Sequence, residues 1–413
     1  MLRRRLSVAA TAALLVLSMA VPAANAAAVT HWVNDDDPNG GAYVPPGTSC
    51  NNPGYARIQD AVIAAGPGDT INVCPGTYPE EVKILPGDDG ITLRSVVPLA
   101  AVIRAPAVMT PPANAIVHVA GAQDVRILGF RITGPGPGGC NSIGVGVLVN
   151  LDGSALIAGN HVTNIRDEPF GGCQNGIGVQ VGSFTASGDV STPGRATIVF
   201  NVIDRYQKGG VIVNEPGSYG RVENNVLRGV GPSPAIAQNG IQIGFHASAD
   251  VLENLVSGHS YTGVDDAIWD SAGILLTDLA IPDTVVVSGN RVSRNDIGIW
   301  LSGSGNTPDP EGFGPTLSQR VSRNQSRDNR FDGIFADEFT AANQIRANTA
   351  LGNDRFDCHD EAPPAVTTTV NIWRENTGET QNKPNLCRDR GHRDGDDHHG
   401  KPRPWRDDDE HDD

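Results

Sequence analysis

The sequence is poor in aromatic residues, lysine and long apolar stretches. Aromatic side chains make up 5% of its 413 residues, 4 of the 31 basic side chains are lysine, and charged residues reach 19%. Glycine and proline are abundant by contrast, with 49 and 29 copies, and would interrupt helices too often for a helical bundle. A hydrophobic share of 39% is too high for a chain that is disordered throughout. These proportions exclude an all-helical protein.

The balance of charge excludes one class of partner. The formal net charge is −16, and the arginines near the N-terminus make the remainder of the chain more acidic still. Such a field repels polyanions, so we expect no nucleic-acid partner.

The N-terminus has the pattern of an export signal. Arg3, Arg4 and Arg5 precede an apolar run over 8–21, which is too short to span a bilayer, and Ala24-Asn25-Ala26 fits a cleavage site. No later stretch approaches 18 apolar residues, so we expect no transmembrane segment. The sequence predicts a signal peptide over 1–26 and a secreted product.

Cysteine usage agrees with export. The six cysteines form three groups that are local in sequence, and no C-x-x-C motif points to a metal. Closure of neighbours is the simplest of the possible pairings in an oxidising compartment, with free or metal-bound thiols as the alternative. The expected disulfides are Cys50–Cys74, Cys140–Cys173 and Cys358–Cys387.

Two interleaved repeats dominate the middle of the chain. A glycine followed by alternating apolar residues recurs every 25 to 35 residues, which is the period of a solenoid. The copies begin at Gly144, Gly176, Gly210, Gly240, Gly273, Gly298 and Gly333. Strand alternation then predicts an interior filled by Ile177, Val179, Val211, Val213, Ile241, Ile243, Ile274, Leu276, Ile299, Leu301 and Ile334. Parallel strands stacked coil upon coil would bury this aliphatic column.

The second repeat is an asparagine that precedes a short strand. It occurs at Asn160, Asn201, Asn225, Asn254, Asn290, Asn324 and Asn348, with a weaker copy at Asn376. Asparagine tolerates left-handed backbone at a sharp bend, and stacked amides can hydrogen-bond to one another. We expect a structural ladder rather than a ligand site.

The ends of the repeat region differ from its middle. Ile58, Ala61, Val62 and Ala65 have helical spacing, which predicts a short helix that covers the open end of the core, with the first strand at 70–73. Residues 388–413 are rich in acids and histidine and are expected to form a disordered tail, with divalent-metal binding as the less favoured alternative. The predicted domains are the signal peptide, one domain over 27–387 and this tail.

The segments 58–62, 67–71 and 75–80 resemble the N-terminal capping coil of right-handed parallel β-helix proteins in the pectin-lyase-like superfamily. The glycine and asparagine coils resemble the repeats of that superfamily over about 55–380. The resemblance implies an all-β, right-handed parallel β-helix with a short N-terminal capping helix. The superfamily includes pectate and alginate lyases, polygalacturonases, pectin methylesterases, epimerases, phage tailspikes and surface proteins without known activity.

No catalytic motif of those enzymes can be placed on this sequence. Asp265-Asp266 matches the paired acids of polygalacturonases, but Gly258-His259 precedes it in the wrong order and the outer motifs are missing. The segment 331–335 resembles a methylesterase motif only superficially. Whether the protein is an enzyme therefore stays open.

An acidic cluster is the first candidate site. Asp265, Asp266 and Asp270 surround Trp269 directly before a core strand, with His259 close in sequence. Such carboxylates could hold Ca²⁺ or supply the acid and base of glycoside hydrolysis, and the alternative is an exposed acidic loop. We take all three as candidate catalytic residues and Asp265 and Asp266 as candidate metal ligands.

A line of outward-facing side chains is the second candidate. Strand alternation places Ile212, Gln242, Leu275, Trp300 and Phe335 on the solvent side of successive coils. Exposed apolar lines mark a ligand, a partner or a covering loop. Trp300 and Phe335 are candidate sugar-binding residues, and Lys208 and Arg205 could pair with anionic sugars.

The sequence thus predicts a secreted solenoid that binds or processes an extracellular polysaccharide, as a lyase or glycoside hydrolase if it is an enzyme. The alternative is a non-catalytic surface or adhesive solenoid. The oligomeric state is not predicted.

Overall fold

The computed structural model describes residues 27–36, 40, 42–184, 191–264, 270–280, 283–305, 313–363 and 370–388. The predicted signal peptide, Asp265, Asp266, Trp269 and nearly all of the predicted tail lie outside these residues. No helix in the described part of the chain has the length and hydrophobicity that crossing a bilayer requires.

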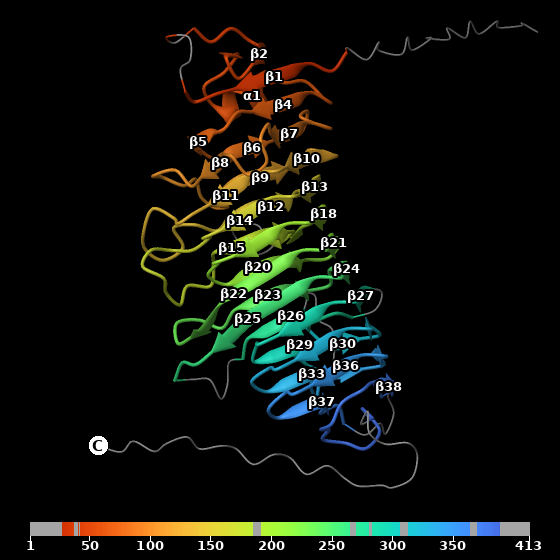
Figure 1. The fold of residues 1–413 in the computed structure, drawn as a ribbon. Coiled ribbons are helices and arrows are strands. Elements are labelled where there is room, and N and C mark those ends of the chain that lie inside the picture. Colours follow the sequence, from red (N-terminus) through yellow and green to blue (C-terminus); the bar gives the residue numbers. More distant parts are fainter. Residues whose placement is uncertain are drawn as a thin grey trace, which may run out of the picture.

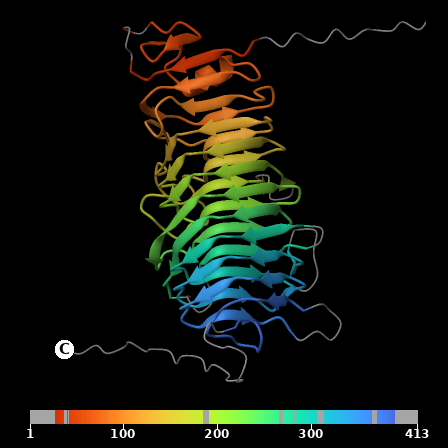
Figure 2. The same ribbon diagram turned by 45° about the vertical axis from the view of Figure 1, so that its right-hand side comes forward.

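Three long parallel sheets run the length of the molecule, and each coil from β4 to β37 contributes one strand to each sheet in turn, while β1 and β38 add strands to the first sheet alone (Figures 1 and 2). Sheet 1 consists of β1 (Thr30–Val33), β4 (Thr70–Val73), β7 (Thr92–Ser95), β10 (Val125–Leu128), β13 (Ser154–Ala158), β18 (Arg195–Val199), β21 (Tyr219–Glu223), β24 (Ser248–Leu252), β27 (Val285–Ser288), β31 (Arg320–Ser322), β35 (Gln344–Arg346) and β38 (Ile372–Arg374). Sheet 2 consists of β5 (Gly76–Pro79), β8 (Ala101–Arg104), β11 (Arg131–Thr133), β14 (His161–Thr163), β19 (Val202–Asp204), β22 (Val226–Ser233), β25 (Leu255–Tyr261), β28 (Arg291–Ser293), β32 (Gln325–Arg327) and β36 (Thr349–Leu351). Sheet 3 consists of β6 (Val82–Ile84), β9 (Ala115–Ala120), β12 (Val145–Asn150), β15 (Ile177–Val181), β20 (Gly209–Asn214), β23 (Asn239–Gly244), β26 (Ala272–Thr277), β29 (Ile297–Ser302), β33 (Asp332–Ala336) and β37 (Phe356–Asp360).

Three small strand pairs lie outside these sheets. They are β2 (Gly47–Ser49) with β3 (Asn52–Pro53), β16 (Ser183–Phe184) with β17 (Ser191–Thr192), and β30 (Thr316–Leu317) with β34 (Thr340–Ala341).

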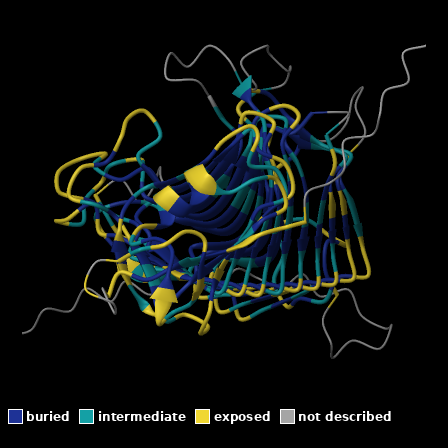
Figure 3. Ribbon diagram, turned by 90° about the horizontal axis from the view of Figure 1, so that it is seen from above, coloured by how far each residue is buried: buried dark blue, intermediate teal, exposed yellow. Residues whose placement is uncertain are grey.

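The core is the aliphatic column that the repeats predict, enclosed by the three sheets (Figure 3). Ile241, Ile274, Ile299 and Ile334 occupy one register position on successive strands and are fully buried. One predicted core residue is wrong. Ile177 packs outside this column, because Gly178 rather than Gly176 aligns with Gly210 and the inward position falls on Val179.

The asparagine ladder is confirmed. From Asn160 to Asn376, the backbone amide and side-chain Nδ2 of each asparagine donate to Oδ1 of the next, at 2.9 to 3.1 Å. Each asparagine of the ladder is almost completely buried, so these bonds satisfy polar groups that water cannot reach.

The helix α1 (Ile58–Ala64) forms where predicted and lies beside β1, β4 and β6 near the N-terminal end of the stack. Its function as a cap and the right-handed sense of the coils stay predictions. The expectation that 70–73 forms the first strand is wrong, because β1 precedes it and pairs with it in parallel. β1 alternates exposed or half-buried side chains with buried ones and extends sheet 1 by one strand.

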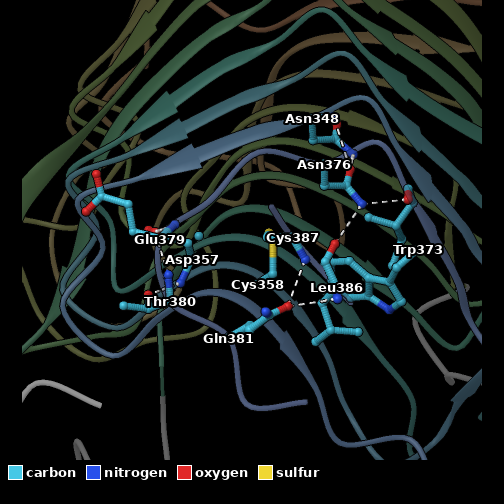
Figure 4. The surroundings of a disulfide bond; sticks show 12 residues. Asn348, Asp357, Cys358, Trp373, Asn376, Glu379, Thr380, Gln381, Leu386 and Cys387 are labelled. Atoms are coloured by element: carbon cyan, nitrogen blue, oxygen red, sulfur yellow. Dashed lines mark hydrogen bonds between the residues drawn. A yellow bond between two sulfur atoms is a disulfide. The ribbon is translucent and has the colours of Figure 1, made fainter. Parts of the chain in front are cut away.

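All three predicted disulfides are present, between Cys50 and Cys74, Cys140 and Cys173, and Cys358 and Cys387. The last one attaches the final segment of the chain to β37 (Figure 4). Beside it, Oε1 of Gln381 accepts hydrogen bonds from the backbone amides of Leu386 and Cys387 at 2.8 and 2.9 Å.

Candidate functional site

One column of side chains runs along the outer face of sheet 3, with one residue from each strand. We call this set the outer column; its members are Lys83, His118, Leu148, Gln180, Ile212, Gln242, Leu275, Trp300, Phe335 and His359. The register predicted for the five residues from Ile212 to Phe335 is therefore confirmed. The expectation that all five are exposed is wrong.

Two of the five predicted residues, Ile212 and Phe335, are buried by their neighbours. Ile212 is 5% exposed because its side chain extends over Gly209 and contacts the cluster formed by Leu148 and Ile177. Phe335 is 7% exposed because rings cover it on both sides and the Arg355 guanidinium lies 5.7 Å from its centroid.

The C-terminal end of the outer column is aromatic. The rings of Trp300 and Phe335 stack with centroids 5.9 Å apart, and Phe335 stacks on His359 at 4.5 Å. We call these three residues the aromatic stack. The Trp300 side chain is half-buried, and its indole nitrogen makes no hydrogen bond within the described residues. That nitrogen is itself buried, so what the half-buried Trp300 can offer a ligand is apolar ring surface.

Asp332 fixes the charged groups around this stack. Its fully buried carboxylate accepts from the Arg355 guanidinium and lies 3.1 Å from Nδ1 of His359. The other nitrogen of His359, Nε2, lies 3.2 Å from the Glu361 carboxylate. The ion pair therefore holds both Arg355 and His359 against the aromatic rings.

Asp296 is a second buried carboxylate, one coil away, and it has a structural role. It accepts from the Ser260 hydroxyl and the Tyr261 amide at 2.7 Å and from the Ser271 amide at 3.0 Å. The Arg330 guanidinium lies 3.6 Å from the same carboxylate. Asp296 thereby joins β25 and β29 to the residues before β26.

Asp270 is the one member of the predicted acidic cluster that the structure describes. Burial, followed by the carboxylate of Asp296, raises the pKa of Asp270 to about 6, although Arg355 and Arg330 act in the opposite direction. Its Oδ1 is buried and has no hydrogen-bond partner in the described part of the chain. Asp270 therefore combines an unsatisfied oxygen with a pKa suited to proton transfer near neutral pH.

The other sequence candidates lie apart from this region. The Lys208 ammonium donates to the carbonyl of Ala237 at 3.0 Å, and burial lowers its pKa. Arg205 is exposed on the turn that follows β19. Lys208 directly precedes β20, which is three strands from β29 in sheet 3, so neither basic residue joins the aromatic stack.

His259, which is near the acidic cluster in sequence, points into the interior instead. It is fully buried, its Nε2 bonds to the Tyr206 hydroxyl, and its Nδ1 lies 2.8 Å from Oδ1 of Asn295. Burial lowers the pKa of His259 to about 4, so the ring is neutral at physiological pH.

The N-terminal end of the outer face holds a cavity of about 690 Å³. Lys83, His118, Asn150 and Gln180 contribute to its wall, and Nε2 of His118 lies 2.8 Å from Oδ1 of Asn150. The outer face therefore carries this cavity at its N-terminal end and the aromatic stack at its C-terminal end.

Sequence reasoning missed Asp296, Asp332, Arg355 and His359. A signal for the two acids exists, because Asp296 and Asp332 stand two residues and one residue before glycines of the repeat. Arg355 and His359 belong to the last coil, where the glycine repeat is lost and no pattern places them.

One group of potential metal ligands occurs within the described residues, namely Cys140, Asp167 and Cys173. Both sulfurs form a disulfide, and Asp167 accepts bonds from the amides of Asn141 and Ser142, so this group is unsuited to a metal. The predicted Ca²⁺ ligands Asp265 and Asp266 lie outside the described residues.

No protein-family model matches the sequence, and no curated protein matches it. Solved structures do match its fold. The Dettilon tailspike protein aligns with a TM-score of 0.55 and 15% identity, over 78% of this chain and 57% of the tailspike. XylC, solved in complex with xylose, aligns with a TM-score of 0.51 and 12% identity, over 82% of this chain and 70% of XylC.

The chain is a parallel β-helix protein. At these identities the parallel β-helix fold is what the chain shares with its neighbours, and it spans little more than half of the tailspike. The chemistry of this β-helix has to be argued from its own residues.

Proposed function

We propose that this protein is a secreted, right-handed parallel β-helix that binds an extracellular polysaccharide along the outer face of sheet 3. Trp300 carries the proposal, because its half-buried ring can stack against the apolar face of a sugar, while the stacked ring of Phe335, itself buried, holds it in place. Asp332, Arg355 and Glu361 provide charged groups around it. The solved complex of XylC with xylose, on a similar fold, supports a saccharide as the ligand.

Replacement of the indole tests this proposal. Trp300→Ala should weaken binding to the preferred polysaccharide about tenfold or more, because the ring on which the sugar stacks is lost. Affinity electrophoresis against pectin, alginate, xylan and a glycosaminoglycan provides the measurement. Phe200→Ala is the matched control, because Phe200 is 67% exposed on a turn that does not belong to sheet 3.

Equal binding by Trp300→Ala and the parent protein would contradict the proposed site. Absence of binding to every polysaccharide would favour the alternative, a surface or adhesive solenoid without a sugar ligand.

Processing of the polysaccharide is a second candidate function, supported by Asp270. A carboxyl group with a pKa of about 6 can donate a proton to a leaving oxygen near neutral pH. Asp270→Asn should abolish the formation of new reducing ends or unsaturated products while retaining the affinity for polysaccharide. Loss of affinity in this variant would instead assign Asp270 to binding.

Calcium is proposed as the cation for Asp265 and Asp266. The double change Asp265→Asn with Asp266→Asn should then abolish Ca²⁺-dependent binding of polysaccharide without a change in the β-sheet circular dichroism spectrum. Binding that is independent of Ca²⁺ in the parent protein would contradict this assignment.

A further inference from the structure

Two neighbouring strands of sheet 2 extend beyond the edge of the stack. β22 and β25 are longer than the other strands of the sheet (Figures 1 and 2). Their pairing shifts in register between Arg228 and Gly231 before it resumes. Beyond the shift, Gly231, Pro232 and Ser233 pair with His259, Ser260 and Tyr261. This extension forms one wall of a pocket of about 620 Å³, a volume typical of ligand sites.

Three arginines from three different coils line this pocket. Arg228 belongs to β22, Arg294 follows β28, and Arg330 precedes β33. Three guanidinium groups therefore converge on one pocket of a chain whose net charge is −16.

Arg330 is held in place before any ligand arrives. Its Nη1 donates to the carbonyl of Tyr261 at 2.7 Å, and its guanidinium lies 4.7 Å from the ring centroid of Phe331. Arg228 and Arg294, by contrast, form no ion pair with any carboxylate in the described ranges. Asp328 and Asp354 line the pocket too, and Arg330 is paired with the Asp296 carboxylate at 3.6 Å, so the guanidinium groups left for a ligand are those of Arg228 and Arg294.

We propose that this pocket is an oxyanion-binding site for a carboxylate, sulfate or phosphate group. Guanidinium groups present several N–H donors in a plane and match the oxygens of such groups. Two arginines without carboxylate partners leave those donors available to a ligand. The pocket is separate from the outer face of sheet 3, so this inference does not depend on the proposed polysaccharide site.

Anion titrations of the full chain test the proposal. Sodium sulfate, sodium phosphate and sodium glucuronate are each added at constant ionic strength, and the melting temperature is compared with that in sodium chloride. A ligand that binds only the folded state raises the melting temperature. We expect at least one of the three anions to raise it and to saturate, and the anion that does so identifies the group recognised.

The variant Arg228→Gln with Arg294→Gln should raise the apparent dissociation constant of that anion about tenfold or more. Arg294→Lys should weaken it less, because the charge remains while the planar group is lost. Arg291→Gln is the matched control, because Arg291 is exposed on β28 but does not line the pocket. Trp300→Ala should leave the anion response unchanged even if it abolishes polysaccharide binding.

Two outcomes would overturn the proposal. One is a melting temperature that responds to the three anions no more than to chloride. The other is an anion response that survives in Arg228→Gln with Arg294→Gln, or that Arg291→Gln removes equally well.

Discussion

At the scale of single residues, Glu215 is the most unusual ionisable group. It directly follows β20, is 1% exposed, and its Oε2 has no hydrogen-bond partner in the described part of the chain. Burial raises its pKa to about 7. The folded state therefore prefers the protonated carboxyl, whereas the unfolded chain ionises near the ordinary value of 4.5.

This difference predicts how stability depends on pH. Between about pH 4.5 and pH 7 the folded state binds more protons at Glu215 than the unfolded state, so the contribution of this residue falls as the pH rises. Glu215→Gln removes this pH dependence. The free energy of unfolding of the variant should rise relative to that of the parent protein by on the order of 2–3 kcal/mol between pH 4 and pH 7.5. Urea unfolding of both proteins at several pH values measures it. A constant difference across this range would show that Glu215 is ionised in the folded state.

At the scale of elements, the glycine of each coil is required by the close approach of neighbouring strands. A Cβ at Gly178 would lie 2.6 Å from the carbonyl oxygen of Gly210 and 2.6 Å from the Ile203 side chain. The aligned glycines of the other coils meet the next coil in the same way, and their column is Gly146, Gly178, Gly210, Gly240, Gly273, Gly298 and Gly333.

Gly178→Ala should therefore destabilise the protein by about 1–3 kcal/mol through overpacking. Gly305→Ala is the control, because a Cβ there would meet no atom of the described residues within 4 Å. Chemical denaturation compares the two variants with the parent protein. Equal denaturation midpoints for Gly178→Ala and Gly305→Ala would mean that neighbouring coils can move apart to admit the methyl group without destabilising the protein.

Repetition decides which elements the sequence can predict. The ladder from Asn160 to Asn376 is predictable because each copy precedes a similar short strand. A second ladder of Asn295, Asn329 and Asn353, which ends on Asp357, has too few members for its period to stand out. The charged groups at the aromatic stack are unpredictable for a related reason, since Arg355 reaches Asp332 from a coil without the glycine repeat.

At the scale of the whole molecule, each coil contacts mainly its neighbours, so the two ends of the stack can open separately. The Cys358–Cys387 disulfide spans 29 residues and attaches the final segment to β37. Removing a disulfide that closes a loop of this length lowers the free energy of unfolding by about 3 kcal/mol.

Replacing both cysteines by serine should accordingly loosen the C-terminal coils first. Amide hydrogen exchange should accelerate in β36, β37 and β38 while β4 to β12 keep the rates of the parent protein. Uniform acceleration along the chain would instead indicate that the stack unfolds as a single cooperative unit.

The asparagine ladder also gives the molecule an electrical polarity. Each side-chain Oδ1 in it accepts from the N-terminal side, beginning with the backbone amide of Phe130, and each Nδ2 donates to the next rung, ending on the carbonyl of Leu386. The second hydrogen of each Nδ2 is donated back to a backbone carbonyl of the preceding coil, such as that of Ile127, and every rung repeats this arrangement in the same direction. Aligned amide dipoles add, as they do along a helix, and each bond polarises the next. The ladder is thus one oriented chain of amides, so removal of a single rung interrupts the alignment and leaves the amides on the two sides of the gap as shorter, separate dipoles.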